Sequence, residues 1–143
     1  MKKFHELILG GARSGKSRLA EQRAEETGLE LLYLATATAG DAEMSERIRH
    51  HQARRQRKWS LLEEPTGLAE ALSQHAQDDQ CILVDCLTLW VSNCLHKNCW
   101  EQQRDKLLTV LPNLRGTIIF VSNETGMGVV PMGELSRKFV DES

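Results

Sequence analysis

The stretch Gly10-Gly11-Ala12-Arg13-Ser14-Gly15-Lys16-Ser17 decides the fold class of this chain, because it fits the pattern G-x-x-x-x-G-K-[ST]. An apolar run, residues 7–9, precedes it, and a helix-like stretch, residues 17–27, follows it. A strand, a glycine-rich loop and a helix in this order form a P-loop, whose backbone N–H groups surround phosphate oxygens. The start of the helix adds unpaired N–H groups and a partial positive charge. We therefore predict a nucleotide-binding loop rather than a glycine-rich turn that matches by chance.

Two side chains at the end of this loop have specific chemistry. Lys16 can reach the β- and γ-phosphates of a nucleoside triphosphate. The Ser17 hydroxyl can ligate a Mg²⁺ ion bound to the same phosphates. The sequence thus predicts Mg²⁺ as the cofactor, with the nucleotide as a substrate.

Composition limits the remaining classes of function. The chain has 143 residues, which suits one domain with its own core. Its net charge of −2 gives no basic field for nucleic acid, and no apolar run is long enough to span a membrane. The N-terminus does not fit a signal peptide, and the four cysteines have no metal-binding spacing. We expect a cytoplasmic protein with reduced thiols, among which Cys81 and Cys86 lie in or beside a buried strand.

Strand-like and helix-like segments alternate along the chain. Strands are predicted near residues 7–9, 31–35, 60–62, 81–85 and 117–122, and helices at residues 16–27, 43–55, 66–75 and 100–111. Three of the strands are dense apolar runs, which is typical of strands covered on both faces. This alternation predicts an α/β fold over residues 1–143: one P-loop NTPase-like domain of three layers, with a mainly parallel sheet between helices. Residues 133–142 begin a helical pattern without a stop signal, so we expect the C-terminal part of the domain to be missing.

Polar residues follow two of the apolar strands. Asp85 ends the run at residues 81–85; in P-loop proteins such a strand often lies beside the first one and aims its carboxylate at Mg²⁺. The alternative is an aspartate that caps the next helix. The second cluster, with two glycines, is typical of a ligand-facing loop, although an ordinary turn fits as well: Ser122-Asn123-Glu124-Thr125-Gly126-Met127-Gly128. Asp85 and Glu124 are both candidates for the acid nearest Mg²⁺.

A basic segment at residues 47–58 contains two adjacent histidines. Six of its twelve residues are Arg or Lys, and a protonated histidine could supply a seventh positive charge. On a helix, Arg47, His50 and Arg54 share a face, while His51 lies on a nearby face. Neighbouring arginines lower the pKa of a histidine, and a neutral imidazole is a nucleophile whose phosphate target the arginines could hold. The alternatives are a solvated basic face or an RNA-binding patch, and the spacing does not choose between His50 and His51.

Several segments together resemble one family over nearly the whole chain. The chain is similar to the bifunctional adenosylcobinamide kinase / adenosylcobinamide-phosphate guanylyltransferases of cobalamin synthesis. The resemblance rests on the P-loop followed in order by Tyr33-Leu34-Ala35-Thr36, Asp41-Ala42-Glu43-Met44, Arg47-Ile48-Arg49-His50-His51, Trp59 with Glu63, Asp85-Cys86-Leu87-Thr88, Val91-Ser92-Asn93 and Val121-Ser122-Asn123-Glu124-Thr125-Gly126-Met127-Gly128-Val129-Val130-Pro131.

The resemblance implies two reactions. ATP or GTP phosphorylates the aminopropanol hydroxyl of adenosylcobinamide, and GTP then gives GMP to a histidine, from which the phosphorylated product takes it to form adenosylcobinamide-GDP. The resemblance makes His50 the nucleophile and implies a homotrimer with active sites between subunits. The nucleotide-binding residues it implies are the P-loop, Gly10, Gly11, Ala12, Arg13, Ser14, Gly15, Lys16 and Ser17, together with Ala35, Thr36, Ala37, His51, Gln52, Ala53, Arg54, Glu63 and Asp85.

Other readings of the motifs predict other functions. A P-loop kinase of another small hydroxyl substrate would use Lys16 and leave His50 structural. A regulatory GTP-binding module would be expected to carry an Asn-Lys-x-Asp motif, which does not occur here. An RNA-binding protein would be expected to have a basic net charge and aromatic residues within the basic segment, and this chain has neither.

Overall fold

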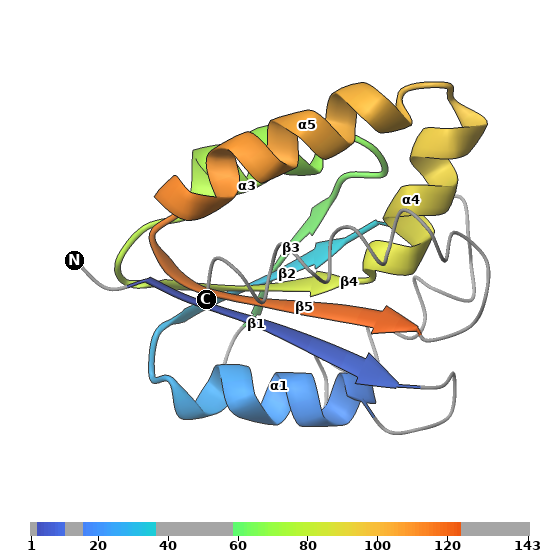
Figure 1. Ribbon diagram of the computed structural model, residues 1–143. Helices are drawn as coiled ribbons and strands as arrows, with labels where there is room; N and C mark the ends of the chain where they lie inside the picture. The colour runs from blue at the N-terminus through green and yellow to red at the C-terminus, as the bar shows by residue number, and fades with distance from the viewer. Residues whose placement is uncertain (1–2, 11–15, 37–58, 124–143) are drawn as a thin grey trace.

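The residues that the structure describes include a central sheet of five parallel strands (Figure 1). The computed structural model describes residues 3–10, 16–36 and 59–123. The strands are β1 (Lys3–Gly10), β2 (Glu30–Ala35), β3 (Trp59–Glu63), β4 (Gln80–Asp85) and β5 (Gly116–Asn123). Their order across the sheet is β1-β5-β4-β2-β3, and every neighbouring pair is parallel. The α/β fold and all five predicted strands are confirmed.

Helices cover both faces of the sheet, as the alternating pattern predicts. Figure 1 shows α1 (Lys16–Glu26) on one face, and α3 (Leu68–His75), α4 (Leu87–His96) and α5 (Trp100–Val110) on the other. The helix predicted at residues 43–55 and the one beginning at 133 lie outside the described residues. Helix α3 begins two residues later than predicted, and α5 continues into a short 3₁₀ helix, Leu111–Asn113, that contains Pro112.

The core is divided by the sheet into two layers, because side chains alternate between the faces of each strand. Leu34, Val84 and Phe120 pack towards α3, α4 and α5. Tyr33, Leu83 and Ile119 pack on the other face with Ala20 and Ala24 of α1. The three apolar runs that predicted doubly covered strands are β2, β4 and β5, which are the inner strands of the sheet. Cys81 is fully buried in β4, as expected, and all four cysteines are free thiols.

The position of β4 corrects one expectation. The strand that ends in Asp85 does not lie beside the P-loop strand, because β5 pairs with both β1 and β4 and separates them. Residues Ile118, Ile119, Phe120 and Val121 of β5 are all buried, two on each face. A strand that is buried on both faces is stable where other strands flank it and helices cover both faces. Burial therefore favours an inner position for β5 in the sheet. A ligand that contacts both the P-loop and Asp85 must therefore span the end of β5.

Two glycines with positive φ provide a matched test of this packing. Gly116 begins β5 at φ 80°, and a Cβ there would lie 2.0 Å from the backbone oxygen of Gln77. Gly28, after α1, has φ 73° but no atom within 4 Å of such a Cβ. We expect Gly28→Ala to cost about 1–2 kcal/mol from left-handed strain alone. Gly116→Ala should cost about 2–5 kcal/mol, because backbone overpacking adds to the strain. Urea unfolding of both variants measures the difference, and equal losses would contradict the close approach of Gly116 to Gln77.

Candidate functional site

Those predicted nucleotide-binding residues that lie on the described strands end at one edge of the sheet. All strands run in the same direction, so their carboxyl ends lie together, and ligands of open α/β sheets bind outside these ends. The register pairs Gly10 with Asn123, Asp85 with Ala35, and Ala35 with Glu63. Predicted residues from four strands thus form a row along this edge, with the end of β5 between Gly10 and Asp85.

The ends of the P-loop lie at this edge. Strand β1 ends at Gly10 and α1 begins at Lys16, which confirms the strand and the helix expected on either side of the loop. Figure 1 shows the start of α1 on the same side as the arrowheads of β1 and β5. Residues 11–15 and the side chains of Lys16 and Ser17 lie outside the described part of the chain. A helix that begins here directs backbone N–H groups and a partial positive charge towards the edge.

The side chain of Asp85 lies on the face of the sheet that α1 covers. Its carboxylate accepts a hydrogen bond from the hydroxyl of Tyr33, which packs in the layer beneath α1. The helix-capping alternative is wrong, because the N-cap of α4 is Cys86, whose Sγ accepts the N–H of Leu89 at 3.4 Å. Sequence reasoning missed the role of Tyr33. The signal was a tyrosine within an apolar strand, since a buried hydroxyl needs a polar partner.

Thr36 fixes the backbone next to Asp85. Its side chain is fully buried, and its hydroxyl donates to the carbonyl of Cys86 at 2.9 Å and accepts the N–H of Cys86 at 3.0 Å. Its backbone N–H donates to the carbonyl of Asp85 at 3.1 Å. The amide of Asn93 in α4 donates to the carbonyl oxygens of Thr36 at 3.0 Å and Pro65 at 3.1 Å. These bonds join the ends of β2 and β4 to α4.

The end of β5 is anchored in a similar way. Ser122 is fully buried, and its hydroxyl lies 2.8 Å from the hydroxyl of Thr88 in α4. Ser122 therefore belongs to the support of the edge, although the sequence placed it at the start of a ligand-facing loop. The remainder of that loop, residues 124–128, lies outside the described residues.

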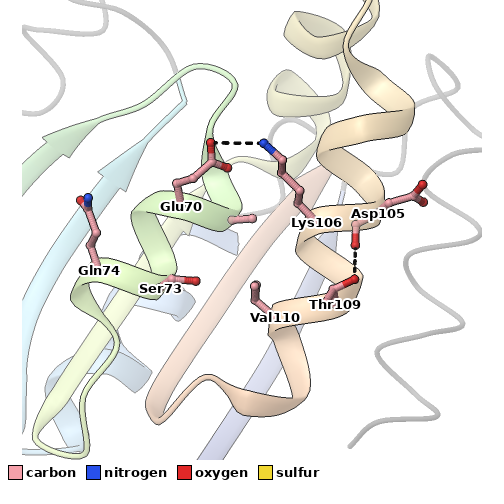
Figure 2. A pocket seen from close by; sticks show the side chains of 8 residues that line it. Glu70, Ser73, Gln74, Asp105, Lys106, Thr109 and Val110 are labelled. Carbon is pink, nitrogen blue, oxygen red and sulfur yellow. Dashed lines mark hydrogen bonds and ion pairs between the residues drawn. The ribbon is translucent and has the colours of Figure 1, made fainter.

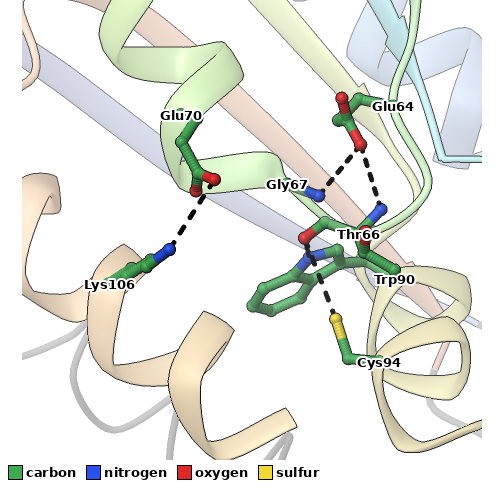
Figure 3. Close-up of polar contacts among 7 residues, drawn as sticks. All are labelled: Glu64, Thr66, Gly67, Glu70, Trp90, Cys94 and Lys106. Carbon is green, nitrogen blue, oxygen red and sulfur yellow. Dashed lines mark hydrogen bonds and ion pairs between the residues drawn. The ribbon is translucent and has the colours of Figure 1, made fainter. Parts of the chain in front are cut away.

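Glu63 and Glu64 differ in their surroundings at the end of β3. Glu63 is exposed, and its strand pairs with β2. The carboxylate of Glu64 accepts the N–H groups of Thr66 at 3.3 Å and Gly67 at 3.0 Å (Figure 3). Because these bonds form a turn, α3 begins after Gly67 rather than at Thr66. Glu63, and not Glu64, thus has a carboxylate available at the edge.

A separate pocket of about 520 Å³ lies between α3 and α5 (Figure 2). Glu70, Ser73 and Gln74 line it from α3, and Lys106, Thr109 and Val110 from α5. The ion pair between Lys106 and Glu70, at 3.8 Å, is exposed on both sides and contributes little. None of the predicted site residues in the described part of the chain lines this pocket, so it is distinct from the row at the strand ends.

The comparison with protein families decides where the chain belongs. The model of the cobinamide kinase / cobinamide phosphate guanyltransferase family matches residues 6–143. The chain belongs to this family. It is 57% identical to the bifunctional adenosylcobalamin biosynthesis protein CobP of Pseudomonas aeruginosa, over 98% of the chain and 83% of that protein. It is 32% identical to the CobU proteins of Escherichia coli and Salmonella typhimurium, each over 94% of the chain and 83% of the relative.

Solved structures with low sequence identity share the fold of this family member. A KaiC-like protein of Pyrococcus horikoshii is 18% identical with a TM-score of 0.57, over 87% of the chain and 62% of that protein. The flagellar accessory protein FlaH of Methanocaldococcus jannaschii is 13% identical with a TM-score of 0.55, over 93% of the chain and 67% of that protein. At these identities the likeness shows the P-loop NTPase-like α/β fold alone.

Several predicted residues lie outside the described part of the chain. These are Gly11, Ala12, Arg13, Ser14, Gly15, Ala37, His50, His51, Gln52, Ala53, Arg54 and Glu124. Within the described ranges, no three His, Cys, Asp or Glu residues lie close enough together to hold a metal ion by themselves. The helices of these ranges are all too short or too polar to cross a membrane.

The bonds of Thr36 can be tested by replacement with valine. Thr36→Val keeps the shape but leaves the partly buried N–H of Cys86 without its acceptor, so we expect a loss of about 1–3 kcal/mol in unfolding free energy. Thr109→Val is the matched control, because the exposed Thr109 hydroxyl donates to the carbonyl of Asp105 within α5. It should change stability by less than about 0.5 kcal/mol. Urea unfolding measures both, and equal effects would contradict the supporting role of Thr36.

Proposed function

We propose that this chain catalyses both reactions of its family. A nucleoside triphosphate, ATP or GTP, phosphorylates the aminopropanol hydroxyl of adenosylcobinamide, and GMP is then transferred from GTP through a guanylylated histidine to give adenosylcobinamide-GDP. The match of the family model to residues 6–143 carries this proposal. The row of Gly10, Asp85, Ala35 and Glu63 at one sheet edge supports it, since nucleotide phosphates bind at such edges.

The phosphoryl transfer is assigned to the P-loop. The substrate hydroxyl forms a bond to the γ-phosphorus, the bond to the β-phosphate oxygen breaks, and the hydroxyl proton leaves. Such transfers need positioning and charge neutralisation more than covalent help from the protein. Gly10 to Ser17 are the residues for this task, with Lys16 neutralising the β- and γ-phosphates.

The donor set at the edge fits Mg²⁺. The hydroxyl of Ser17 and the carboxylate of Asp85 are oxygen ligands, which Mg²⁺ prefers, and phosphates and water usually complete its shell. The bond from Tyr33 orients the Asp85 carboxylate on the face of the sheet that also carries α1. When bound, Mg²⁺ would neutralise charge on the transferred phosphoryl group.

The guanylyl transfer is assigned to His50. Its imidazole attacks the α-phosphorus of GTP, a P–N bond forms, and pyrophosphate leaves. The phosphate of the first product then attacks the same phosphorus, and the P–N bond breaks to release the histidine. Nucleotide binding in this step is assigned to Ala35, Thr36, Ala37, His51, Gln52, Ala53, Arg54, Glu63 and Asp85. Since the Thr36 hydroxyl is bonded to Cys86, we assign the contact of this segment to its backbone.

The proposed assembly is a homotrimer with active sites between subunits, on the basis of the resemblance to the family. In this arrangement the exposed Glu63 on strand β3 and the basic segment at residues 47–58 would belong to shared sites.

The guanylylated histidine is tested by intact mass after incubation with GTP and Mg²⁺. We expect one GMP adduct on the wild-type chain and none on His50→Ala. The control variant that keeps His50 is His51→Ala. His51→Ala should still form the adduct, although more slowly. Native mass measured on the same sample reports the trimer, and circular dichroism confirms that each variant is folded. An adduct that survives in His50→Ala and disappears in His51→Ala would move the nucleophile by one residue.

Addition of adenosylcobinamide to the same samples separates the two candidate functions. A chain that phosphorylates adenosylcobinamide without forming the adduct would contradict the second reaction only. A folded chain that transfers neither a phosphoryl group to adenosylcobinamide nor GMP to itself would favour a P-loop kinase of another small hydroxyl substrate.

Asp85 can be tested separately from the P-loop. Asp85→Asn removes the negative charge, so we expect the rate of phosphoryl transfer to fall by about 10²–10³. The Mg²⁺ concentration for half-maximal rate should rise at least about tenfold, because a carboxylate ligand is lost. Tyr33→Phe removes one hydrogen bond to this carboxylate, and its effect should be the smaller one. Assays over a Mg²⁺ series check both, and an unchanged Mg²⁺ dependence in Asp85→Asn would exclude Asp85 from the metal site.

A further inference from the structure

The end of α4 brings two cysteines together. Asn98, just after the helix, has a positive φ of 57°. The N–H of Cys99 donates to the carbonyl oxygen of Cys94 at 2.9 Å, and the N–H of Asn98 donates to the carbonyl oxygen of Leu95 at 3.2 Å. This is a Schellman motif, in which a left-handed residue ends the helix and the next residue folds back on the last turn. The two side chains that meet in this motif are usually apolar. Here they are the thiols of Cys94 and Cys99.

The two thiols are neighbours but differ in access. Cys99 packs against the core cluster that contains Cys94. The Sγ of Cys94 lies 3.9 Å from the carbonyl oxygen of Thr66 (Figure 3). Cys94 is fully buried, whereas Cys99 is half-buried and lines a surface pocket of about 340 Å³ with Trp100 and Glu101. Burial, followed by the influence of the neighbouring Cys99 thiol, raises the pKa of Cys94 to about 12. An external reagent should therefore meet Cys99 first.

We propose that Cys94 and Cys99 form a reversible disulfide when the folded protein meets a low-molecular-weight disulfide such as oxidised glutathione. The thiolate of Cys99 attacks one sulfur of the reagent, a mixed disulfide forms, and one thiolate leaves. Cys94 then loses its proton to solvent and attacks the Cys99 sulfur, and the second thiolate leaves. In sum, the two protein thiols are oxidised and the reagent is reduced to two thiols.

The fold favours this pair over the others. Cys81 is fully buried within β4, and the Sγ of Cys86 caps the start of α4 by accepting the N–H of Leu89. Cys94 and Cys99 lie at the opposite end of α4. Of the possible cysteine pairs, this is the one whose members are brought together by the helix-ending motif. The carbonyl of Thr66 keeps its bond from Trp90 Nε1, at 2.8 Å, when Cys94 no longer has a proton to donate. Closure of the disulfide thus costs the neighbouring network little.

The test treats the folded wild-type chain with oxidised glutathione, blocks the remaining thiols, and maps the linkages by mass spectrometry. We expect an intact mass lower by two hydrogens before the blocking step, and a Cys94–Cys99 linkage at least about tenfold more abundant than any other pairing. Dithiothreitol should restore four free thiols. Cys81→Ala, which leaves the pair intact, should behave like wild type, and Cys94→Ala should stop at a glutathione adduct on Cys99. Circular dichroism before and after treatment confirms that the chain stays folded.

Two results would overturn the proposal. One is a wild-type chain that holds glutathione on Cys99 while Cys94 remains a free thiol. The other is a distribution of linkages in the folded chain that equals the distribution in concentrated urea, where the helix-ending motif does not exist. Both outcomes are read on the wild-type protein, so they do not depend on the folding of any variant.

Discussion

The parallel pairing of β2, β4 and β5 is the constraint on which the remaining structure depends. These three strands are buried on both faces, so each must run through the centre of the sheet. Parallel strands have their carboxyl ends at the same edge, and this places Gly10, Asp85 and Glu63 along one edge of the sheet. The candidate site is therefore a consequence of the direction of the strands, because residues 10, 63 and 85 have no local relation in the sequence.

Buried polar bonds keep that edge in place. Thr36 satisfies both backbone groups of Cys86, Asn93 binds two carbonyl oxygens, and Ser122 pairs with Thr88. Each bond alone contributes about 1 kcal/mol, but a buried donor or acceptor without a partner would cost more. Thr36 and Ser122 belong to segments that the sequence suggested for ligand contact, and Asn93 belongs to a segment that carried the family resemblance. In this structure their side chains hold β2, β4 and β5 to α4, and a rigid support of this kind is what a positioned carboxylate requires.

The sequence predicted the elements of the fold better than their arrangement. Dense apolar runs identified β2, β4 and β5 because doubly buried strands have no polar face. The order of strands was not predictable in this way, and β5 separates the two strands that were expected to be neighbours. Helix α4 was missed because its sequence, Leu87–His96, is apolar directly after a strand and its N-cap is a cysteine instead of Ser, Thr, Asp or Asn. The bond between Tyr33 and Asp85 joins residues 52 positions apart, so no local pattern contains it.

The alternation of side chains at the strand ends explains which polar residues support the edge and which are available for chemistry. In β2, Tyr33 lies two residues after Leu31, and in β4, Asp85 lies two residues after Leu83. Side chains two residues apart point to the same face, and here this is the face covered by α1. Thr36 and Ser122 lie two residues after Leu34 and Phe120, which face α4. On this face Thr36 bonds to Cys86, and Ser122 bonds to Thr88. Helix α1 covers this face, so the phosphate site that we propose at its N-terminus would share the face that holds Asp85. A shift of one residue in the register of β4 would move Asp85 away from α1, since successive side chains point to opposite faces. The buried apolar residues of β4 fix that register, and in this way the core determines the position of the carboxylate.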